Sequence, residues 1–285
     1  MKYCFVFFAT CLLAGCSGLQ TLDALAPHDG YRAQTDIAYG ENPRQNLDIY
    51  IPDHARPTSD VIVFFYGGRW ESGDKADYRF VGQAFASMGY VVVIADYRLY
   101  PQVYFPVFVQ DGAHAVAWTH AHIASYGGNP DRIFLAGHSA GAYIAAMLAV
   151  NSPYLHEAGV KRTWIKGMIG LAGPYDFLPF TDADVKDIFS RAPDALTQPI
   201  HYVSPGLPPF LLLTGDEDTS VYPKNTHHLA QRLREAGDVV TERVYPGVAH
   251  IGILLSLAGG FRSKAPSLAD IDRFINEIDG IKTLP

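Results

Sequence analysis

Residues 131–149 read DRIFLAGHSAGAYIAAMLA and predict a strand, a tight turn and a helix in direct succession. The run at 133–136 is apolar throughout, as in a strand that is buried on both faces of a parallel sheet. The run at 143–149 contains small and apolar residues, which suit a buried helix. Strands that alternate with helices in this way build parallel sheets with helices on both faces.

The pentapeptide Gly137-His138-Ser139-Ala140-Gly141 joins these two elements. It fits the turn called a nucleophile elbow, in which a strained backbone lifts a serine hydroxyl clear of the sheet. Glycines two residues before and two after the serine let neighbouring backbone pass close by, where a Cβ would collide. A plain glycine-rich turn is the alternative, but the position between a buried strand and a helix favours the elbow. We therefore predict that Ser139 is a nucleophile.

The composition is that of one large globular domain. The chain has 285 residues, of which 48% are hydrophobic and 18% charged, so it can bury a sizeable core. Its formal net charge of −7 argues against nucleic acid or an anionic lipid surface as the main partner, since both repel an acidic protein. The sequence leaves the oligomeric state open.

The N-terminus has the pattern of an export signal. Lys2 precedes an apolar segment at 4–13 that is too short to span a bilayer. The segment ends in Leu13-Ala14-Gly15-Cys16, which resembles the lipobox of bacterial lipoproteins, whose cysteine is acylated and becomes the mature N-terminus. The alternatives are an ordinary signal peptide that is cleaved nearby and a buried apolar segment. We expect a signal peptide at 1–15, a lipidated tether at 16–34 and one folded domain at 35–285.

The lipobox resemblance implies an exported protein that is anchored to a membrane through lipid on Cys16. Ser17 follows this cysteine, which resembles lipoproteins of the outer membrane if the host is Gram-negative. The other two cysteines, Cys4 and Cys11, also lie in the signal segment. The folded domain therefore has neither a disulfide nor a thiolate metal site.

Several apolar runs and helical patterns predict a doubly wound, mainly parallel sheet with helices on both faces. Two alternating segments, 36–39 and 47–51, predict a leading antiparallel hairpin of half-buried edge strands. Further strands are expected at 61–65, 91–95, 165–172, 210–213 and 239–244, and further helices at 78–88, 108–126, 224–236 and 271–278. The proline-rich segment 173–204 breaks these patterns and predicts a small cap over the site.

A serine nucleophile needs a base and an acid that orients the base. In this architecture both are expected in loops that follow later strands. His250 follows the strand at 239–244, and three carboxylates, Asp216, Glu217 and Asp218, follow the strand at 210–213. The order serine, acid, histidine is the one expected for α/β-hydrolases. The spacing alone does not distinguish among the three carboxylates.

Gly67 and Gly68 directly follow the buried strand at 61–65. A glycine pair in this place lets backbone amides turn outward, where they can stabilise an oxyanion, although a plain turn is the alternative. Aromatic residues lie in the loops expected near the mouth, among them Tyr66, Trp70 and Tyr175. They either bind an apolar or aromatic part of a substrate or only pack the core.

Three histidines, His114, His120 and His122, lie on the predicted helix at 108–126. Without carboxylates at ligand spacing they are better explained as surface or packing residues than as metal ligands. We predict no metal site and no cofactor.

Five motifs together resemble the α/β-hydrolase carboxylesterases that include hormone-sensitive-lipase-like, feruloyl and acetylxylan esterases, kynurenine formamidases and isoprenylcysteine methylesterases. They are YGGRWESGDK (66–75), DYRLYP (96–101), GGNPDRIFLAGHSAGAYIAA (127–146), LLLTGDEDTSVYP (211–223) and YPGVAH (245–250). The resemblance covers the chain from about residue 36 to its end. It implies an α/β-hydrolase domain with a small cap.

The same resemblance assigns residues to roles. It implies that Asp218 is the acid and that the amides of Gly67, Gly68 and Ala140 form the oxyanion hole. The family usually has histidine before the glycine pair, whereas this chain has Tyr66, so we expect retained activity with an altered pocket wall.

The expected activity is hydrolysis of a small-molecule carboxylic ester by Ser139, His250 and Asp218. An amidase, arylformamidase or peptidase could use the same three residues, because the intermediates are the same. A binding lipoprotein without catalysis is a third reading, which the filled triad positions disfavour. The sequence does not identify the natural substrate.

Overall fold

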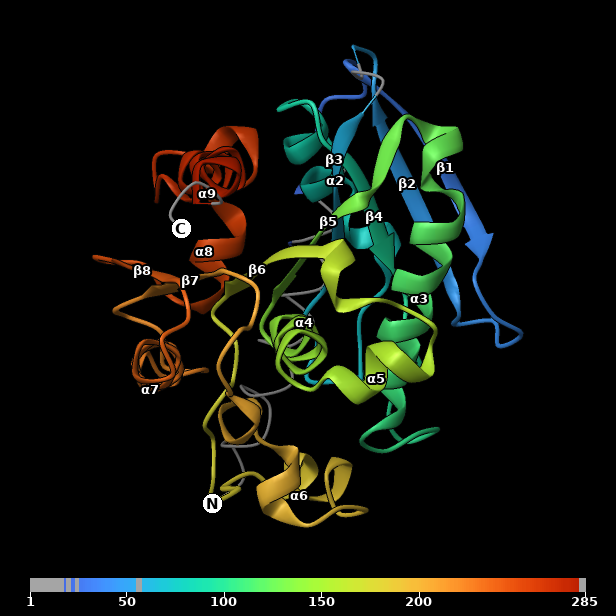
Figure 1. Ribbon diagram of the computed structural model, residues 1–285. Coiled ribbons are helices and arrows are strands. Elements are labelled where there is room, and N and C mark those ends of the chain that lie inside the picture. The colour runs from blue at the N-terminus through green and yellow to red at the C-terminus, as the bar shows by residue number, and fades with distance from the viewer. Residues whose placement is uncertain (1–17, 19–21, 24–25, 55–57, 282–285) are drawn as a thin grey trace, which may run out of the picture.

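The computed structural model describes residues 18, 22–23, 26–54 and 58–281. Within these residues, eight strands form one sheet in the order β1-β2-β4-β3-β5-β6-β7-β8 (Figure 1). The strands β4, β3, β5, β6, β7 and β8 are mutually parallel, whereas β2 is antiparallel to both β1 and β4. The predicted α/β architecture with a mainly parallel sheet is confirmed. The strand bounds are β1 Tyr31–Ala38, β2 Asn46–Pro52, β3 Ser59–Phe65, β4 Val91–Ala95, β5 Gly128–His138, β6 Ile165–Leu171, β7 Phe210–Gly215 and β8 Val240–Tyr245.

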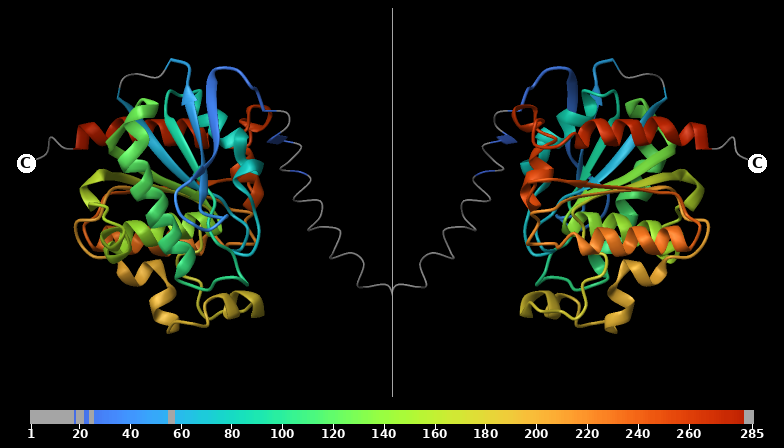
Figure 2. Two further views of the ribbon diagram at one scale, coloured as in Figure 1. Left: turned by 90° about the vertical axis from the view of Figure 1, so that its right-hand side faces the viewer. Right: turned by 90° about the vertical axis from the view of Figure 1, so that its left-hand side faces the viewer.

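Helices cover both faces of the sheet. On one face lie α2 and α9, and on the other lie α3, α4 and α7 (Figure 2). Residues 61–65 of β3 are all apolar because the strand packs on both faces: Phe64 packs against Phe85 of α2, and Phe65 points to the opposite face. The α-helices are α2 Arg79–Ala86, α3 Val107–His122, α4 Ala140–Val150, α5 Ser152–Glu157, α6 Ala183–Ile188, α7 Lys224–Glu235, α8 His250–Leu255 and α9 Ser267–Ile281.

The N-terminal hairpin of β1 and β2 forms as predicted, with two differences. The strand β1 begins at Tyr31 and so includes residues that we expected in the tether. The strand β2 is not an edge strand, because it also pairs with β4, and residues 47–52 are buried as a result. Local alternation in the sequence does not reveal such a second partner.

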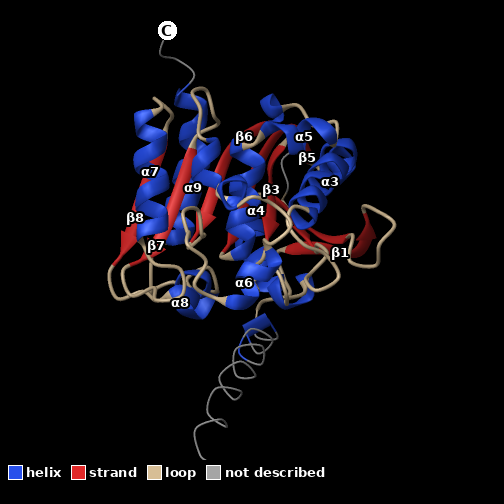
Figure 3. Ribbon diagram, turned by 90° about the horizontal axis from the view of Figure 1, so that it is seen from below, coloured by secondary structure: helices blue, strands red, loops and turns tan. Residues whose placement is uncertain are grey.

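The segment 173–204 contains α6 and two short 3₁₀ turns and lies over the end of the sheet where the parallel strands finish (Figure 3). The hydroxyl of Tyr143 on α4 donates to the carbonyl of Thr197, and the amide of Phe105 donates to the carbonyl of Ile188. These bonds tie the segment to the main domain, as expected for a small cap.

The predicted signal segment 1–15 and the lipidation site Cys16 lie outside the described residues. Among the residues that are described, no helix has the length and hydropathy that a membrane span requires.

Candidate active site

Ser139 lies between the end of β5 and the start of α4, in the predicted elbow. Its φ of 54° and ψ of −122° are strained for a residue with a side chain. A Cβ on Gly137 would lie 2.4 Å from the carbonyl carbon of Gly141, and a Cβ on Gly141 would lie 1.9 Å from the carbonyl oxygen of Phe65. Both glycines are therefore required by close backbone approach.

The side chains of Ser139, His250 and Asp218 meet at this elbow. The Nε2 atom of His250 lies 2.9 Å from Ser139 Oγ, and its Nδ1 atom lies 2.7 Å from Asp218 Oδ2. With the proton on Nδ1, the imidazole donates to the carboxylate and accepts from the serine hydroxyl. The arrangement can withdraw a proton from Ser139 while it attacks a carbonyl carbon.

The structure separates the three candidate acids. Asp218 is 1% exposed, and its second carboxylate oxygen accepts hydrogen bonds from the amides of Ser220 (2.9 Å) and Val221 (2.8 Å). Asp216 is exposed and accepts instead from the amide of Gly247 at 2.7 Å, which joins the loops after β7 and β8. Glu217 is also exposed. Only Asp218 among the three contacts His250 in the described chain.

His138 belongs to the site, although the sequence analysis gave it no role. It is 2% exposed, and its Nε2–H donates to the backbone carbonyl of His250 at 3.1 Å. Burial, and secondly the nearby His250, lower the pKa of His138 to about 3. The ring is therefore neutral, and its hydrogen bond holds the backbone carbonyl of His250 in place. Its place directly before Ser139 was the only available signal.

The low pKa of His138 predicts loss of stability in mild acid. An unfolded histidine titrates near about 6.5, so the unfolded chain binds this proton first as the pH falls. The stabilising contribution of the neutral ring is complete above that pH and is lost as the pH falls toward about 3, the folded value. Between these two pKa values, this group should lower the free energy of unfolding by up to about 1.4 kcal/mol for each unit by which the pH falls.

Urea unfolding of the wild type and His138→Gln at several pH values between neutral and 4 checks this expectation. The variant should show a flatter slope, while His114→Gln, which removes an exposed histidine of α3, should keep the wild-type slope. Equal slopes in the wild type and His138→Gln contradict the prediction.

Two of the three residues assigned to the oxyanion hole, Gly67 and Ala140, lie next to Ser139. Gly67 is adjacent, since a Cβ built on it would lie 3.0 Å from Ser139 Cβ, and Ala140 begins α4, where amide N–H groups have no partner within the helix. Within the described chain, no hydrogen bond outside helices and strands uses the amide of Gly67 or Gly68. The backbone then runs through three successive positive φ values, at Gly68, Arg69 and Trp70.

Two of the three predicted pocket aromatics are not in the pocket. Tyr66 is completely buried under its own loop, where its hydroxyl contacts Asp96, so it forms no pocket wall. Tyr175 is also completely buried, with its hydroxyl against Gly170 and Gly173. Both expectations are wrong, because these loop residues next to the site point back into the core.

Trp70 does line the cavity that contains Ser139, which has a volume of about 440 Å³. The indole is held by stacked and edge-on contacts with Phe108, Tyr143, Phe177 and Phe189. The cavity wall is mixed: apolar side chains form part of it and polar groups form the rest, among them the ion pair of Arg69 and Asp182 (2.8 Å). Further apolar lining comes from the cap, namely Pro174, Phe177, Leu178, Phe180 and Val185.

Among the described residues, no group of three or more His, Cys, Asp or Glu side chains is arranged to hold a metal ion. Of the three histidines on α3, His120 stacks on Trp164 and His122 stacks on Trp118, while His114 is exposed.

Comparison with known proteins places this geometry in context. The family model BD-FAE matches residues 47–233. A probable isoprenylcysteine alpha-carbonyl methylesterase of Arabidopsis thaliana is 31% identical over 242 residues, which are 77% of this chain and 51% of the relative. Esterase LipQ of Mycobacterium tuberculosis is 30% identical over 281 residues, which are 89% of this chain and 66% of the relative. The chain thus spans about half to two-thirds of these curated relatives.

Solved structures share the fold. Esterase B of Lactobacillus rhamnosis with an inhibitor superposes with a TM-score of 0.82 at 20% identity, covering 96% of both chains. Butyrate-bound esterase 2 of Thermogutta terrifontis superposes with a TM-score of 0.70 at 25% identity, covering 88% of this chain and 95% of the other. At 20% identity, the similarity to esterase B shows the fold alone.

Proposed function

The chain belongs to the BD-FAE family, and from this membership and the site we propose that it is a serine hydrolase that cleaves carboxylic esters. The observation that carries the proposal is the position of His250, within hydrogen-bond reach of both Ser139 and Asp218. Similarity to proteins named as esterases supports the ester as the bond that is cleaved.

Each side chain has one task in the proposed reaction. Ser139 Oγ attacks the ester carbonyl carbon while its proton passes to His250 Nε2, and Asp218 holds the imidazole and balances its positive charge. The carbonyl oxygen becomes an oxyanion that accepts from the amides of Gly67, Gly68 and Ala140. The bond to the alcohol oxygen then breaks, and His250 returns the proton to the leaving alcohol. A water molecule attacks the acyl-enzyme by the same route and releases the acid.

The apolar cap side chains that line part of the cavity favour a substrate with an apolar or aromatic group on one side of the ester. The rigid ring of Trp70 and the cap side chains bound the space for that group.

The test is an assay on p-nitrophenyl acetate and p-nitrophenyl butyrate beside N-formylkynurenine, together with labelling by a fluorophosphonate probe. Ester turnover and probe labelling support the proposal. Turnover of the formamide without ester turnover assigns the protein to amidases instead, and absence of labelling contradicts a serine nucleophile.

We also propose that the protein is exported and anchored to a membrane through lipid on Cys16, in the outer membrane if the host is Gram-negative. The support is the Leu13-Ala14-Gly15-Cys16 pattern after a short apolar segment. Cys16→Ser should move the protein from the membrane to the soluble fraction of the cell. Cys11→Ser, within the apolar segment before this pattern, should leave it in the membrane fraction. Retention of the Cys16→Ser protein in the membrane contradicts lipid anchoring.

A further inference from the structure

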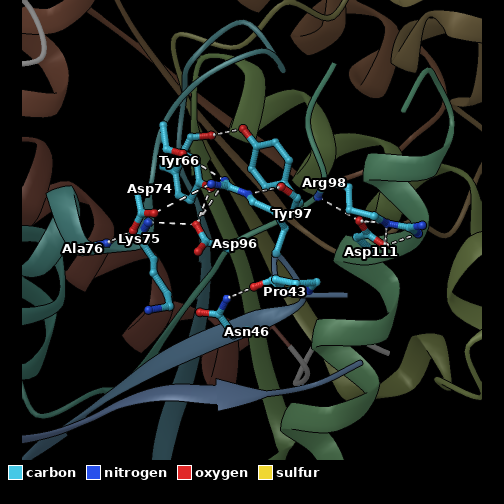
Figure 4. Close-up of polar contacts among 12 residues, drawn as sticks. Pro43, Asn46, Tyr66, Asp74, Lys75, Ala76, Asp96, Tyr97, Arg98 and Asp111 are labelled. Carbon is cyan, nitrogen blue, oxygen red and sulfur yellow. Dashed lines mark hydrogen bonds and ion pairs between the residues drawn. The ribbon is translucent and has the colours of Figure 1, made fainter. Parts of the chain in front are cut away.

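A buried polar cluster lies beneath the loop that carries Gly67 and Gly68 (Figure 4). We call Arg44, Tyr66 and Asp96 the loop clamp. The Tyr66 hydroxyl donates to Asp96 Oδ1 at 2.5 Å and accepts a hydrogen bond from Arg44 Nη2. Tyr66 is completely buried and Asp96 is 3% exposed, so little water competes for these bonds.

The clamp holds both ends of the loop at 66–75. At the far end, Asp96 Oδ1 accepts from the amide of Lys75 at 2.9 Å, and Arg44 Nη2 donates to the carbonyl of Gly73, also at 2.9 Å. At the near end, Tyr66 is bound by its side chain, and its own carbonyl accepts from the hydroxyl of Tyr97 at 2.9 Å. The side chains of Arg44 and Asp96 therefore hold both ends of the loop at 66–75.

Packing removes the remaining freedom of the Tyr66 ring. The ring stacks between Tyr78 and Tyr97, with centroids 5.1 and 4.9 Å away. A Cβ on Gly73 would lie 2.6 Å from the Tyr66 ring, so the returning part of the loop covers it directly. A shift of this ring requires a shift of the loop.

The electrostatics of the clamp keep the phenol as a donor. Burial raises the pKa of Tyr66 well above its ordinary value, so the hydroxyl keeps its proton. Burial also raises the pKa of Asp96, while the hydrogen bond from Tyr66 and the charge of Arg44 act in the opposite direction. Removal of the Tyr66 hydroxyl leaves the buried carboxylate of Asp96 without one of its hydrogen-bond donors. This loss is costly because little water is present to replace that donor.

We propose that Tyr66, Asp96 and Arg44 are positioning residues that hold the amides of Gly67 and Gly68 where the oxyanion of the reaction forms. The proposal rests on the proposed ester hydrolysis. Gly67 directly follows Tyr66 and packs against Ser139, so a displacement of Tyr66 is passed to the amides without an intervening residue. Such amides stabilise the transition state more than the ground state, because the negative charge develops only during the reaction.

The test is Tyr66→Phe, which removes only the hydroxyl. We expect kcat to fall by about 10- to 100-fold with KM within about twofold, since displaced donors weaken transition-state binding more than substrate binding. The affinity for a trifluoromethyl ketone, which forms a tetrahedral adduct with the nucleophile, should fall by a similar factor. Arg44→Gln should show the same pattern, and the double variant should lose less than the product of the two single losses.

Tyr90→Phe is the matched control. Tyr90 donates to Asp272 at 2.6 Å at the opposite end of β4, so this variant also removes a phenol–carboxylate bond. It should lower the melting temperature but keep kcat. A folded Tyr66→Phe protein with wild-type kcat and inhibitor affinity overturns the proposal. If Tyr66→Phe does not fold, Arg44→Gln decides by the same criteria, because the Arg44 side chain is 24% exposed and easier to replace. A wild type without ester turnover refutes the proposed function instead.

Discussion

Ser139→Ala is expected to lower kcat for ester hydrolysis by about 10⁶-fold, to a rate close to background, because the proposed acyl-enzyme forms on this hydroxyl. The hydroxyl lies 2.9 Å from His250 Nε2, and alanine leaves His250 without a proton to withdraw. The measurement is turnover of p-nitrophenyl butyrate together with labelling by a fluorophosphonate probe. Both signals should disappear in the same variant.

Ser220→Ala is the control for this experiment. Ser220 also lines the cavity, but its contribution to the site is the backbone amide that donates to Asp218, which alanine keeps. Its turnover should stay close to the wild-type value. If Ser139→Ala retains turnover within tenfold of the wild type, Ser139 is not the nucleophile.

Asp218→Asn is expected to lower kcat by about 10⁴-fold. The amides of Ser220 and Val221 both donate to Oδ1 of residue 218, so an asparagine should keep its carbonyl oxygen there. Its amide group then faces His250 Nδ1 and donates to it, which places the histidine proton on Nε2. In that tautomer the imidazole cannot accept the proton of Ser139. The measurement is kcat for p-nitrophenyl butyrate, with circular dichroism to show that the variant is folded.

Asp216→Asn and Glu217→Gln are the controls for this second variant. In the part of the chain that the structure describes, the Asp216 carboxylate accepts from the amide of Gly247, and an asparagine carbonyl can do the same. Both controls should therefore keep kcat within about threefold of the wild type, as for surface changes away from the reacting atoms. A large loss in Asp216→Asn with little loss in Asp218→Asn would reverse the assignment of the acid.

Much of the architecture follows from local patterns in the sequence. Apolar runs identify the parallel strands β3, β4, β5, β6 and β7, although Lys166 interrupts the run in β6. The elbow around Ser139 is also recognised from a local pattern, the glycines two residues before and two after the serine, although Gly141 is required by its approach to Phe65, which is distant in the sequence. The order of serine, carboxylate and histidine along the chain restricts the site to loops after particular strands.

The remaining features depend on contacts between segments that are distant in the sequence. The sequence determined the fold class, the elbow, the loops that carry His250 and the three candidate acids, and the position of the glycine pair, because a short local pattern identifies each of them. The family resemblance implied Asp218 as the acid, and in the tertiary structure this carboxylate contacts the imidazole. Only the tertiary structure placed His138 against the backbone carbonyl of His250 and turned Tyr66 away from the pocket toward Asp96. Hydrogen bonds between residues that are tens of positions apart leave no local pattern in the sequence, because the packing of strands and loops determines which partner a side chain meets.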